Sequence, residues 1–389
     1  IGFQSSALPS TGTHLRTAPF VFYLSERAYV IALFFFIKTE KGRMMRGRWR
    51  ITLMLIMVTS VLITPMPVKA AAGQQQVADI QQVLRENKVN GIVLIDGHAH
   101  NPRVISNQTS DDPRLVVKTD RLFPIASFQK LMTGIAIERL VEQGKLSLAT
   151  PLSRYWPSIP HGHQISIQRL MMHTSGLTNQ EPPLNRPLGG EKEQEHYLLR
   201  HYRSSGHFTW NYADIDFSIL AMIVRTASRR SYRSFLNQQI LRPAGMQVKS
   251  YQQVRPGQVT RSGDDWGQLQ TAMSKELGAG DVFCTPQDYW RFYHRAFLEQ
   301  PHLLRRFIAK HGPAGKETYF GGTYIEPPYL HANGYLSGYS CTLYCNYRTK
   351  QTIMLFANNL SYSQLRSLSG QLYHAYFGDY REEQSQINN

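Results

Sequence analysis

Strand-like segments at both ends of the chain, with helical patterns between them, constrain the fold of this sequence more than any other feature. An apolar run at 89–95 is followed by the turn signal Asp96-Gly97 and a second short strand pattern, which together predict a hairpin. The expected elements are strands at 89–95, 103–106, 340–347 and 352–357 and helices at 78–88, 127–143, 217–228 and 363–376. This arrangement predicts an α/β fold in which the two terminal segments share one sheet.

The region from about residue 75 onward is expected to fold as one unit. It contains no low-complexity linker and no internal repeat, and 42% of the chain is hydrophobic, which is enough to build a large core. Some 315 residues, counted from there to the end, are many for a single core. A helical subdomain beside the sheet is therefore expected.

The N-terminal region has the pattern of an export signal. A basic cluster at 43–50 precedes an apolar run at 51–64, which is too short for a comfortable membrane span, and small residues precede a cleavage point after Ala70. An uncleaved membrane anchor is the alternative. Residues 1–43 contain no Met, so we expect them to be translated upstream sequence, with synthesis starting at Met44 or Met45. The expected division is 1–43 upstream sequence, 44–70 signal peptide or membrane anchor, 71–378 folded domain and 379–389 polar tail.

The charge is strongly basic and limits the partners. The whole chain carries +16, and the part after residue 70 keeps 34 basic against 25 acidic residues, or +9. A basic exported protein can attract phospholipid or anionic cell-envelope polymers. No nucleic-acid-binding signature is present, so nucleic acid is not an expected partner. We expect a protein of the cell surface, with possible membrane association through its N-terminal segment.

Ser127 and Lys130 are the first candidate catalytic residues. Their spacing places both side chains on one face of a helix, where a Lys of lowered pKa could take the hydroxyl proton. About one such pair is expected by chance in this composition, and a solvated helix face is the alternative reading. Ser127 is nevertheless the only Ser in the chain with a Lys three residues later.

Further segments resemble the serine β-lactamase and penicillin-binding protein superfamily. Tyr212 begins a Tyr-x-Asp sequence ahead of a helical pattern, where the superfamily has Tyr-x-Asn. The superfamily's "LL-x-HTSGL" segment resembles residues 167–177 of this chain, and its "GG-x-x-ST-x-x-D" segment resembles residues 278–288. The resemblance spans about 75–378 and is close to the class C β-lactamase and D-alanyl carboxypeptidase-like branch. It implies a β-lactamase-like fold, an antiparallel sheet flanked by helices with a helical subdomain. It also implies that Ser127 is the acylated nucleophile, Lys130 its base and Tyr212 the proton shuttle, whereas the segment around His173 would be structural.

The third motif of that superfamily, Lys-Thr-Gly or His-x-Gly on a strand, is imperfect here. The segment 329–340 fits best if Ala332 takes the position of the cation, which leaves His331 one residue early and on the opposite strand face unless a bulge restores it. We expect substrate-binding roles for His331, Asn333, Gly334 and Ser340. The resemblance implies that the strand backbone near Ser340 and the Ser127 amide form an oxyanion hole.

Asp214 is the second departure, since the usual residue is Asn. A carboxylate near Lys130 favours the charged ammonium and so opposes its role as a base, unless that charge serves another purpose. A D-alanyl ester of teichoic acid carries an α-ammonium that Asp214 could bind, and Tyr-x-Asp resembles the D-alanyl esterases acting on teichoic acids. We therefore expect a D-alanyl esterase, with a D-alanyl-D-alanine carboxypeptidase or β-lactamase acting on peptidoglycan peptides or β-lactams as the alternative.

Two hypotheses from other classes remain. Asp96, His98 and His100 resemble the strand-borne metal ligands of amidohydrolases, but a hairpin turn with exposed histidines is favoured because no eight-fold succession of strands and helices follows. A non-catalytic envelope-binding module is the other. No P-loop, HExxH, GxSxG or Rossmann glycine run occurs, so neither a cofactor nor a metal is expected.

Overall fold

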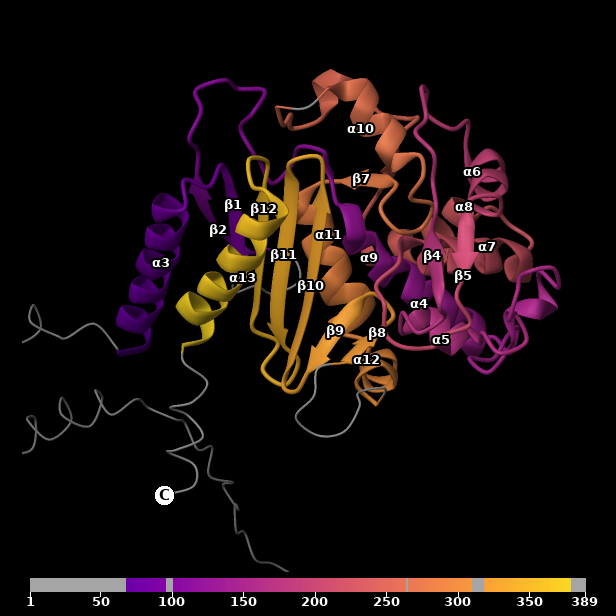
Figure 1. The fold of residues 1–389 in the computed structure, drawn as a ribbon. Helices are drawn as coiled ribbons and strands as arrows, with labels where there is room; N and C mark the ends of the chain where they lie inside the picture. The colour runs from indigo at the N-terminus through magenta and orange to yellow at the C-terminus, as the bar shows by residue number, and fades with distance from the viewer. Residues whose placement is uncertain (1–67, 96–100, 264, 310–317, 379–389) are drawn as a thin grey trace, which may run out of the picture. The chain divides into compact units, whose positions relative to one another are not determined.

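Strands from near both ends of the described region meet in one antiparallel sheet (Figure 1). The computed structural model describes residues 68–95, 101–263, 265–309 and 318–378. The strands, in spatial order, are β2 (Arg103–Asn107), β1 (Gly91–Ile95), β12 (Thr352–Ala357), β11 (Tyr339–Asn346), β10 (Tyr329–Leu336), β9 (Thr323–Glu326) and β8 (Thr318–Phe320). Because β1 pairs with β12, Gly91 opposite Ala357, the prediction that the terminal segments share a sheet is confirmed.

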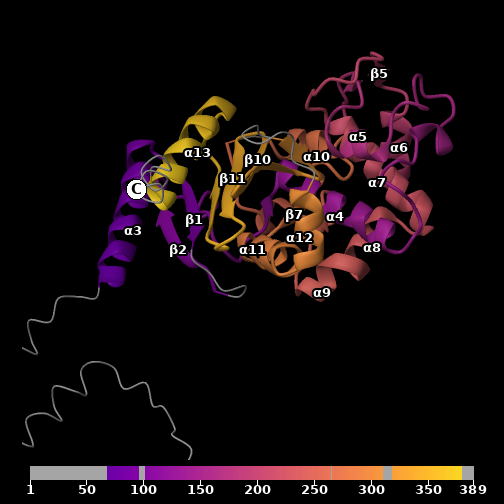
Figure 2. The ribbon, with the colours of Figure 1, turned by 90° about the horizontal axis from the view of Figure 1, so that it is seen from below.

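The alternation of side chains along the strands builds two cores. Val93 and Ile95 of β1 pack with helices α3 (Val68–Glu86) and α13 (Tyr362–Phe377), whereas Ile92 and Leu94 face the larger core on the other side. Figure 2 shows α3 and α13 together on one face of the sheet and the remaining helices beyond the other face. The predicted helices at 78–88 and 363–376 are thus the outer layer.

A helical region covers the second face and confirms the predicted helical subdomain. Its helices are α4 (Gln129–Glu142), α5 (Ile167–Met171), α6 (Glu191–Leu198), α7 (Asp214–Ser228), α8 (Tyr232–Leu236), α9 (Arg242–Ala244), α10 (Trp266–Met273), α11 (Pro286–Phe292) and α12 (Pro301–Ile308). Single turns or wider helical segments are η1 (Ala126–Phe128), η2 (Leu152–Arg154), η3 (Asn237–Leu241), η4 (Pro256–Gln258) and η5 (Tyr293–Leu298). Short strands form two small sheets, β3 (Phe123–Pro124) with β7 (Val282–Cys284) and β6 (Lys249–Ser250), and β4 (Leu177–Asn179) with β5 (Tyr202–Ser204).

The turn between β8 and β9 fixes α4 against the edge of the sheet. Gly322 has a φ of 100°, and a Cβ built there would lie 2.2 Å from the Leu131 nitrogen. On the helix side, a Cβ at Gly134 would lie 2.2 Å from the Gly321 oxygen. Backbone therefore packs on backbone, which only glycine permits at these positions. This contact holds the helix that carries Lys130 beside β8 and β9.

Several predictions fall on parts of the chain that are not described. The export segment, apart from its last residues in α3, the polar tail at 379–389 and the metal-ligand candidates Asp96, His98 and His100 lie outside the described residues. Within the described ranges, no helix has the length and apolar character needed to cross a bilayer. The same ranges contain no cluster of three or more His, Cys, Asp or Glu side chains arranged to hold a metal ion.

Candidate active site

Ser127 lies on the short helix η1, between strand β3 and helix α4. The preceding residue, Ala126, adopts a φ of 45°, a left-handed conformation that is unfavourable for a residue with a Cβ. The Tyr289 hydroxyl donates a hydrogen bond to the Phe128 carbonyl at 3.0 Å, which holds the turn in place. The strained turn thus presents the Ser127 hydroxyl at the junction of the sheet and the helical region.

The ammonium of Lys130 is the centre of the site. It donates hydrogen bonds to Ser127 Oγ at 2.8 Å, to Asp214 Oδ1 at 2.6 Å and to the Ala279 carbonyl at 3.1 Å. The Lys130 side chain is completely buried, while the Asp214 side chain is 36% exposed. Lys130 thus uses all three of its protons, and Asp214 joins it to the solvent-facing part of the site.

A second segment holds the Lys130 face of α4 in place. Gln129 exchanges two hydrogen bonds with Asp281, at 2.7 and 2.6 Å, and Thr133 donates to the Gly278 carbonyl at 2.6 Å. These contacts flank the Lys130 bond to Ala279. The "GG-x-x-ST" segment of the sequence therefore positions Lys130, and none of its side chains is among the described residues that line the cleft above Ser127.

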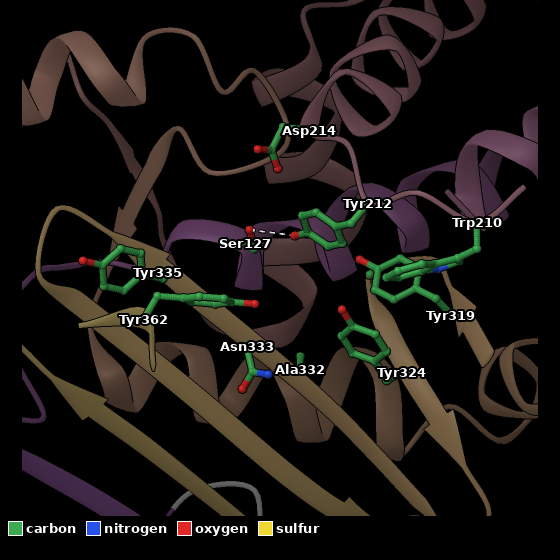
Figure 3. Close-up of a pocket in the computed structure, with 11 residues that line it drawn as sticks. Ser127, Trp210, Tyr212, Asp214, Tyr319, Tyr324, Ala332, Asn333, Tyr335 and Tyr362 are labelled. Atoms are coloured by element: carbon green, nitrogen blue, oxygen red, sulfur yellow. Dashed lines mark hydrogen bonds between the residues drawn. The ribbon is translucent and has the colours of Figure 1, made fainter. Parts of the chain in front are cut away.

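Tyr212 and Asp214 come from the start of α7. The Tyr212 hydroxyl donates to Ser127 Oγ at 2.9 Å (Figure 3), so Ser127 Oγ accepts one hydrogen bond from Tyr212 and one from Lys130. The structure brings together the four residues that the sequence singled out, Ser127, Lys130, Tyr212 and Asp214.

His173 holds the backbone on both sides of Tyr212. Its carbonyl accepts the Asn211 N–H at 2.8 Å, its Nδ1 lies 3.3 Å from the Ala213 nitrogen, and its ring lies 4.4 Å from the Tyr212 ring. Asp216 contacts the same Nδ1 at 2.9 Å. Burial lowers the pKa of His173 and raises that of Asp216, so it favours the uncharged form of each group. His173 supports Tyr212 and does not reach Ser127 in this arrangement.

The electrostatics of the site oppose an uncharged Lys130. Burial is the largest single influence and would lower the pKa of Lys130, but Asp214 and the smaller contributions of Tyr212 and Glu276 together outweigh it, and the pKa lies above its usual value. Burial also raises the pKa of Tyr212, so its hydroxyl is neutral. The site without substrate therefore holds an ammonium, a carboxylate and a phenol around the serine.

The segment that resembles the third motif lies on a regular strand, β10. The pairing of β10 with β11 runs without a bulge from Tyr329 opposite Asn346 to Leu336 opposite Tyr339. The His331 ring is stacked against those of Tyr324 and Tyr344, at centroid distances of 4.5 and 4.9 Å, and does not line the cleft. Ala332 lines it instead. No bulge brings His331 back, so the register favours Ala332 at the place where the resemblance leads us to expect a cation.

Gly334 brings β10 very close to the nucleophile. A Cβ at this position would lie 2.7 Å from the Ile125 oxygen and 3.4 Å from the Ser127 nitrogen. The Tyr347 N–H donates a hydrogen bond to the Pro328 carbonyl, so Pro328 is at a position that bonds to β11. Along an antiparallel strand, residues that bond to a given neighbour alternate with residues that do not. Tyr335 is an odd number of residues from Pro328, so its N–H points away from β11. Strand β9 ends before this point, since its last partner is His331. The Tyr335 and Ser127 amides are therefore the candidate oxyanion donors.

The expectation for Ser340 needs correction. Ser340 is fully buried on β11, opposite Tyr335, and its hydroxyl donates to the Leu360 carbonyl at 3.4 Å. It is one strand removed from the open edge of β10 and does not line the cleft. The candidate backbone donor, expected near Ser340, thus lies at Tyr335 on the neighbouring strand.

Ser127 opens into a cleft of about 340 Å³ that is rich in aromatic rings (Figure 3). Among the described residues that line it, Asp214 is the one charged side chain. The other lining residues are Ser127, Trp210, Tyr212, Tyr319, Gly322, Tyr324, Ala332, Asn333, Tyr335 and Tyr362. Sequence reasoning missed most of these aromatic residues, because they come from separate strands and from the start of α13 and share no motif.

Comparisons with known proteins agree with this geometry. The family model described as Beta-lactamase matches residues 78–367. Penicillin-binding protein PbpX of Bacillus subtilis is 24% identical over 306 residues, covering 76% of this chain and 77% of that protein. D-alanyl-D-alanine-carboxypeptidase/endopeptidase AmpH of Escherichia coli is 29% identical over 223 residues, covering 52% and 55%. Teichoic acid D-alanine hydrolase of Staphylococcus aureus is 24% identical over 265 residues, covering 63% and 64%.

A solved structure shows the same fold. The D-amino acid amidase of Ochrobactrum anthropi superposes with a TM-score of 0.66 at 18% identity, covering 79% of this chain and 99% of that one. The predicted β-lactamase-like fold is thereby confirmed. Since the family model spans well over half of the sequence, this chain belongs to the beta-lactamase family and is a hydrolase.

Proposed function

We propose that this protein is an extracytoplasmic serine hydrolase that removes D-alanine from D-alanyl esters of teichoic acid through a D-alanyl-Ser127 intermediate. One observation carries the proposal. The cleft above Ser127 has a carboxylate, Asp214, as the one charged side chain among its described lining residues, and Ala332 stands where the superfamily has a cation.

The charge of the cleft distinguishes the two substrate classes. A ligand that ends in D-Ala-D-Ala carries a free carboxylate, and no described residue that lines the cleft is a cation that could pair with it, whereas Asp214 would repel it. A D-alanyl ester carries an α-ammonium and no carboxylate. Its charge is complementary to Asp214, whose side chain is 36% exposed on the cleft side of the Lys130 ion pair.

The same ammonium would also activate the nucleophile. In the free site Asp214 keeps Lys130 charged, which prevents it from accepting a proton. A substrate ammonium placed at Asp214 neutralises that carboxylate and repels the Lys130 charge, so it lowers the pKa of Lys130. The base would become available when a cationic acyl group is bound, which favours D-aminoacyl esters over neutral ones.

The reaction then follows from the contacts of Ser127. With its pKa lowered by the bound substrate, Lys130 first releases one proton to solvent and becomes a neutral amine. Ser127 Oγ then attacks the ester carbonyl and its proton passes to Lys130, while the Ser127 and Tyr335 amides hold the oxyanion. The ester C–O bond breaks, and Tyr212 gives its proton to the leaving alkoxide and recovers one from Lys130. Water hydrolyses the D-alanyl ester of Ser127 by the reverse transfers and releases D-alanine.

Related proteins support this substrate class. One relative is named for the hydrolysis of D-alanine from teichoic acid, and the Tyr212-x-Asp214 pattern of this chain resembles that of such esterases. The net charge of +9 after residue 70 suits an anionic polyphosphate chain. AmpH supports the second candidate, a carboxypeptidase acting on peptidoglycan peptides.

The test is D-alanine release by the full chain from D-alanylated lipoteichoic acid and from a muropeptide that ends in D-Ala-D-Ala. The Ser127→Ala variant is the control for both. Release from lipoteichoic acid alone, lost in the control, is the expected result. Release from the muropeptide alone would refute the esterase and favour the carboxypeptidase, and no release from either would favour a binding module.

A further inference from the structure

Exposed aromatic side chains are concentrated at the mouth of the cleft. Four large hydrophobic residues are prominently exposed in the described part of the chain, namely Val104, Trp210, Tyr335 and Tyr362. Three of these four line the single cleft above Ser127, with exposed fractions of 54% for Trp210, 38% for Tyr335 and 52% for Tyr362. Exposed aromatic surface is unfavourable in water, so its concentration at one site indicates a ligand that covers it.

The rings lie on two sides of the nucleophile. Figure 3 shows Trp210 on one side of Ser127 and Tyr335 with Tyr362 on the other. Tyr335 belongs to β10 and Tyr362 begins α13, yet their ring centroids are only 5.8 Å apart. A ligand that contacts both sides therefore extends across the nucleophile and beyond the small acyl group that reacts.

The fold makes little use of these three side chains. Trp210 packs in no ring pair within the described residues, and no hydrogen bond ties its indole or either phenol to the described protein. By contrast, Tyr212 is held against His173 and bonded to Ser127. Trp210, Tyr335 and Tyr362, which we call the aromatic rim, are thus free to bind something else.

The chemistry of the rim favours a sugar. A phosphate group would need cations, and the described lining offers none. A lipid chain would leave the phenol hydroxyls and the Asn333 amide of the same lining without polar partners. A pyranose ring has an apolar face of C–H groups that stacks on an aromatic ring and a belt of hydroxyls that bonds to phenols and amides.

From these observations we infer that the aromatic rim is a carbohydrate-binding subsite, which holds a hexopyranose unit of the polymer on either side of the bond that reacts at Ser127. The subsite does not depend on which acyl group is cleaved. It adds a requirement for a glycosylated polymer to the charge requirement at Asp214.

The test measures sugar binding apart from catalysis. The full chain with Ser127→Ala is titrated calorimetrically with a β-1,4-linked tetramer of N-acetylglucosamine and with the glucose tetramer of the same linkage. We expect millimolar or tighter binding of at least one sugar, weakened about tenfold, or about 1.4 kcal/mol, by Trp210→Ala or Tyr362→Ala added to it. Val104→Ala is the matched control, since Val104 is 46% exposed on β2 but does not line the cleft, and it should leave affinity unchanged.

Three results would overturn the inference. The first is the absence of binding by both tetramers up to about 10 mM. The second is sugar binding that is unaffected by Trp210→Ala and Tyr362→Ala. The third is ring-dependent binding of D-phenylalanine amide without binding of either sugar, which would assign the rim to an aromatic acyl group. Because no D-alanine is present, failure of the proposed esterase would leave this result unchanged.

Discussion

Replacing Asp214 by Asn tests the role of the ion pair with Lys130 directly. The substitution keeps the shape of the side chain and removes its charge. At the observed separation of 2.6 Å and an effective dielectric constant of about 20, the attraction between the two charges is about 6 kcal/mol. The Asp214 side chain is 36% exposed, so solvent screening reduces this by about half, to about 3 kcal/mol.

An energy of about 3 kcal/mol corresponds to a fall of about two units in the pKa of Lys130. Burial of the Lys130 side chain, which already lowers the pKa, is then no longer offset by the carboxylate. At any pH below the pKa of Lys130 in both the parent and the variant, the uncharged fraction of Lys130 should then rise about 100-fold. A base of lower pKa is intrinsically weaker, so the net gain in acylation rate should be nearer tenfold.

The assay compares two substrates across the pH range. With p-nitrophenyl acetate, a neutral ester, Asp214→Asn should acylate about tenfold faster near neutral pH, and the acidic limb of its pH profile should move about two units lower. With a D-alanyl ester the same variant should become slower, since the substrate ammonium has lost its partner. Opposite changes on the two substrates separate this effect from general damage.

Glu181→Gln provides the matched control. Glu181 lines a second pocket together with Asp214, but its carboxylate pairs with Lys275 at 3.2 Å. The Glu181→Gln substitution removes one negative charge near the site from a residue that does not contact Lys130. The rates with p-nitrophenyl acetate and with the D-alanyl ester should therefore each change by less than about threefold. If Asp214→Asn slowed both substrates alike, or left the acidic limb in place, the reasoning about the ion pair would be refuted.

Three further substitutions test the fold around the site. Gly334→Ala should slow acylation at least about tenfold without unfolding the protein, because its Cβ would lie 2.7 Å from the Ile125 oxygen; Gly370→Ala, where a Cβ meets nothing within 4 Å, should leave the rate unchanged. Burial lowers the pKa of His294 from 6.5 to about 4, so the folded state loses stability as pH falls from 6.5 to 4, and His294→Phe should remove about 3 kcal/mol of that loss in urea unfolding. Arg233→Met should cost about 3 kcal/mol in urea unfolding, because completely buried Asp281 loses its ion-pair partner, and a cost below about 1 kcal/mol would contradict this.

Local patterns were sufficient to predict the scaffold. Both faces of β1 and β12 are apolar and must be buried, because successive side chains point to opposite faces of the sheet. One face contributes Val93 and Leu355 to one core, and the other face contributes Leu94 and Phe356 to the second core. An apolar strand at each end of the chain has no partner nearby in sequence except one hairpin neighbour, so pairing of the two ends follows. The Ser127 and Lys130 spacing likewise needs only helix geometry.

The cleft could not be derived in the same way. Tyr319, Tyr324 and Tyr362 come from β8, β9 and the start of α13, and their convergence depends on strand order and on the packing of the β8–β9 turn against α4. The third motif depended on strand register: one residue decides whether His331 or Ala332 faces Ser127, and a bulge was possible until the pairing was known. Misplacing the backbone donor at Ser340 had the same origin.

The two departures from the superfamily pattern are physically linked. Asp214 and Ala332 line the same cleft, on either side of Ser127. A cation at 332 would be attracted to the exposed side of Asp214 and would repel a substrate ammonium, so the cleft could serve neither a carboxylate nor an ammonium well. With Ala332 in that place, Asp214 has Lys130 as its one cationic partner among the described lining and site residues, and its outer oxygen remains available to the substrate. Under the proposed function, the loss of the strand cation and the gain of the helix carboxylate would therefore form a single change in the substrate charge that the site binds.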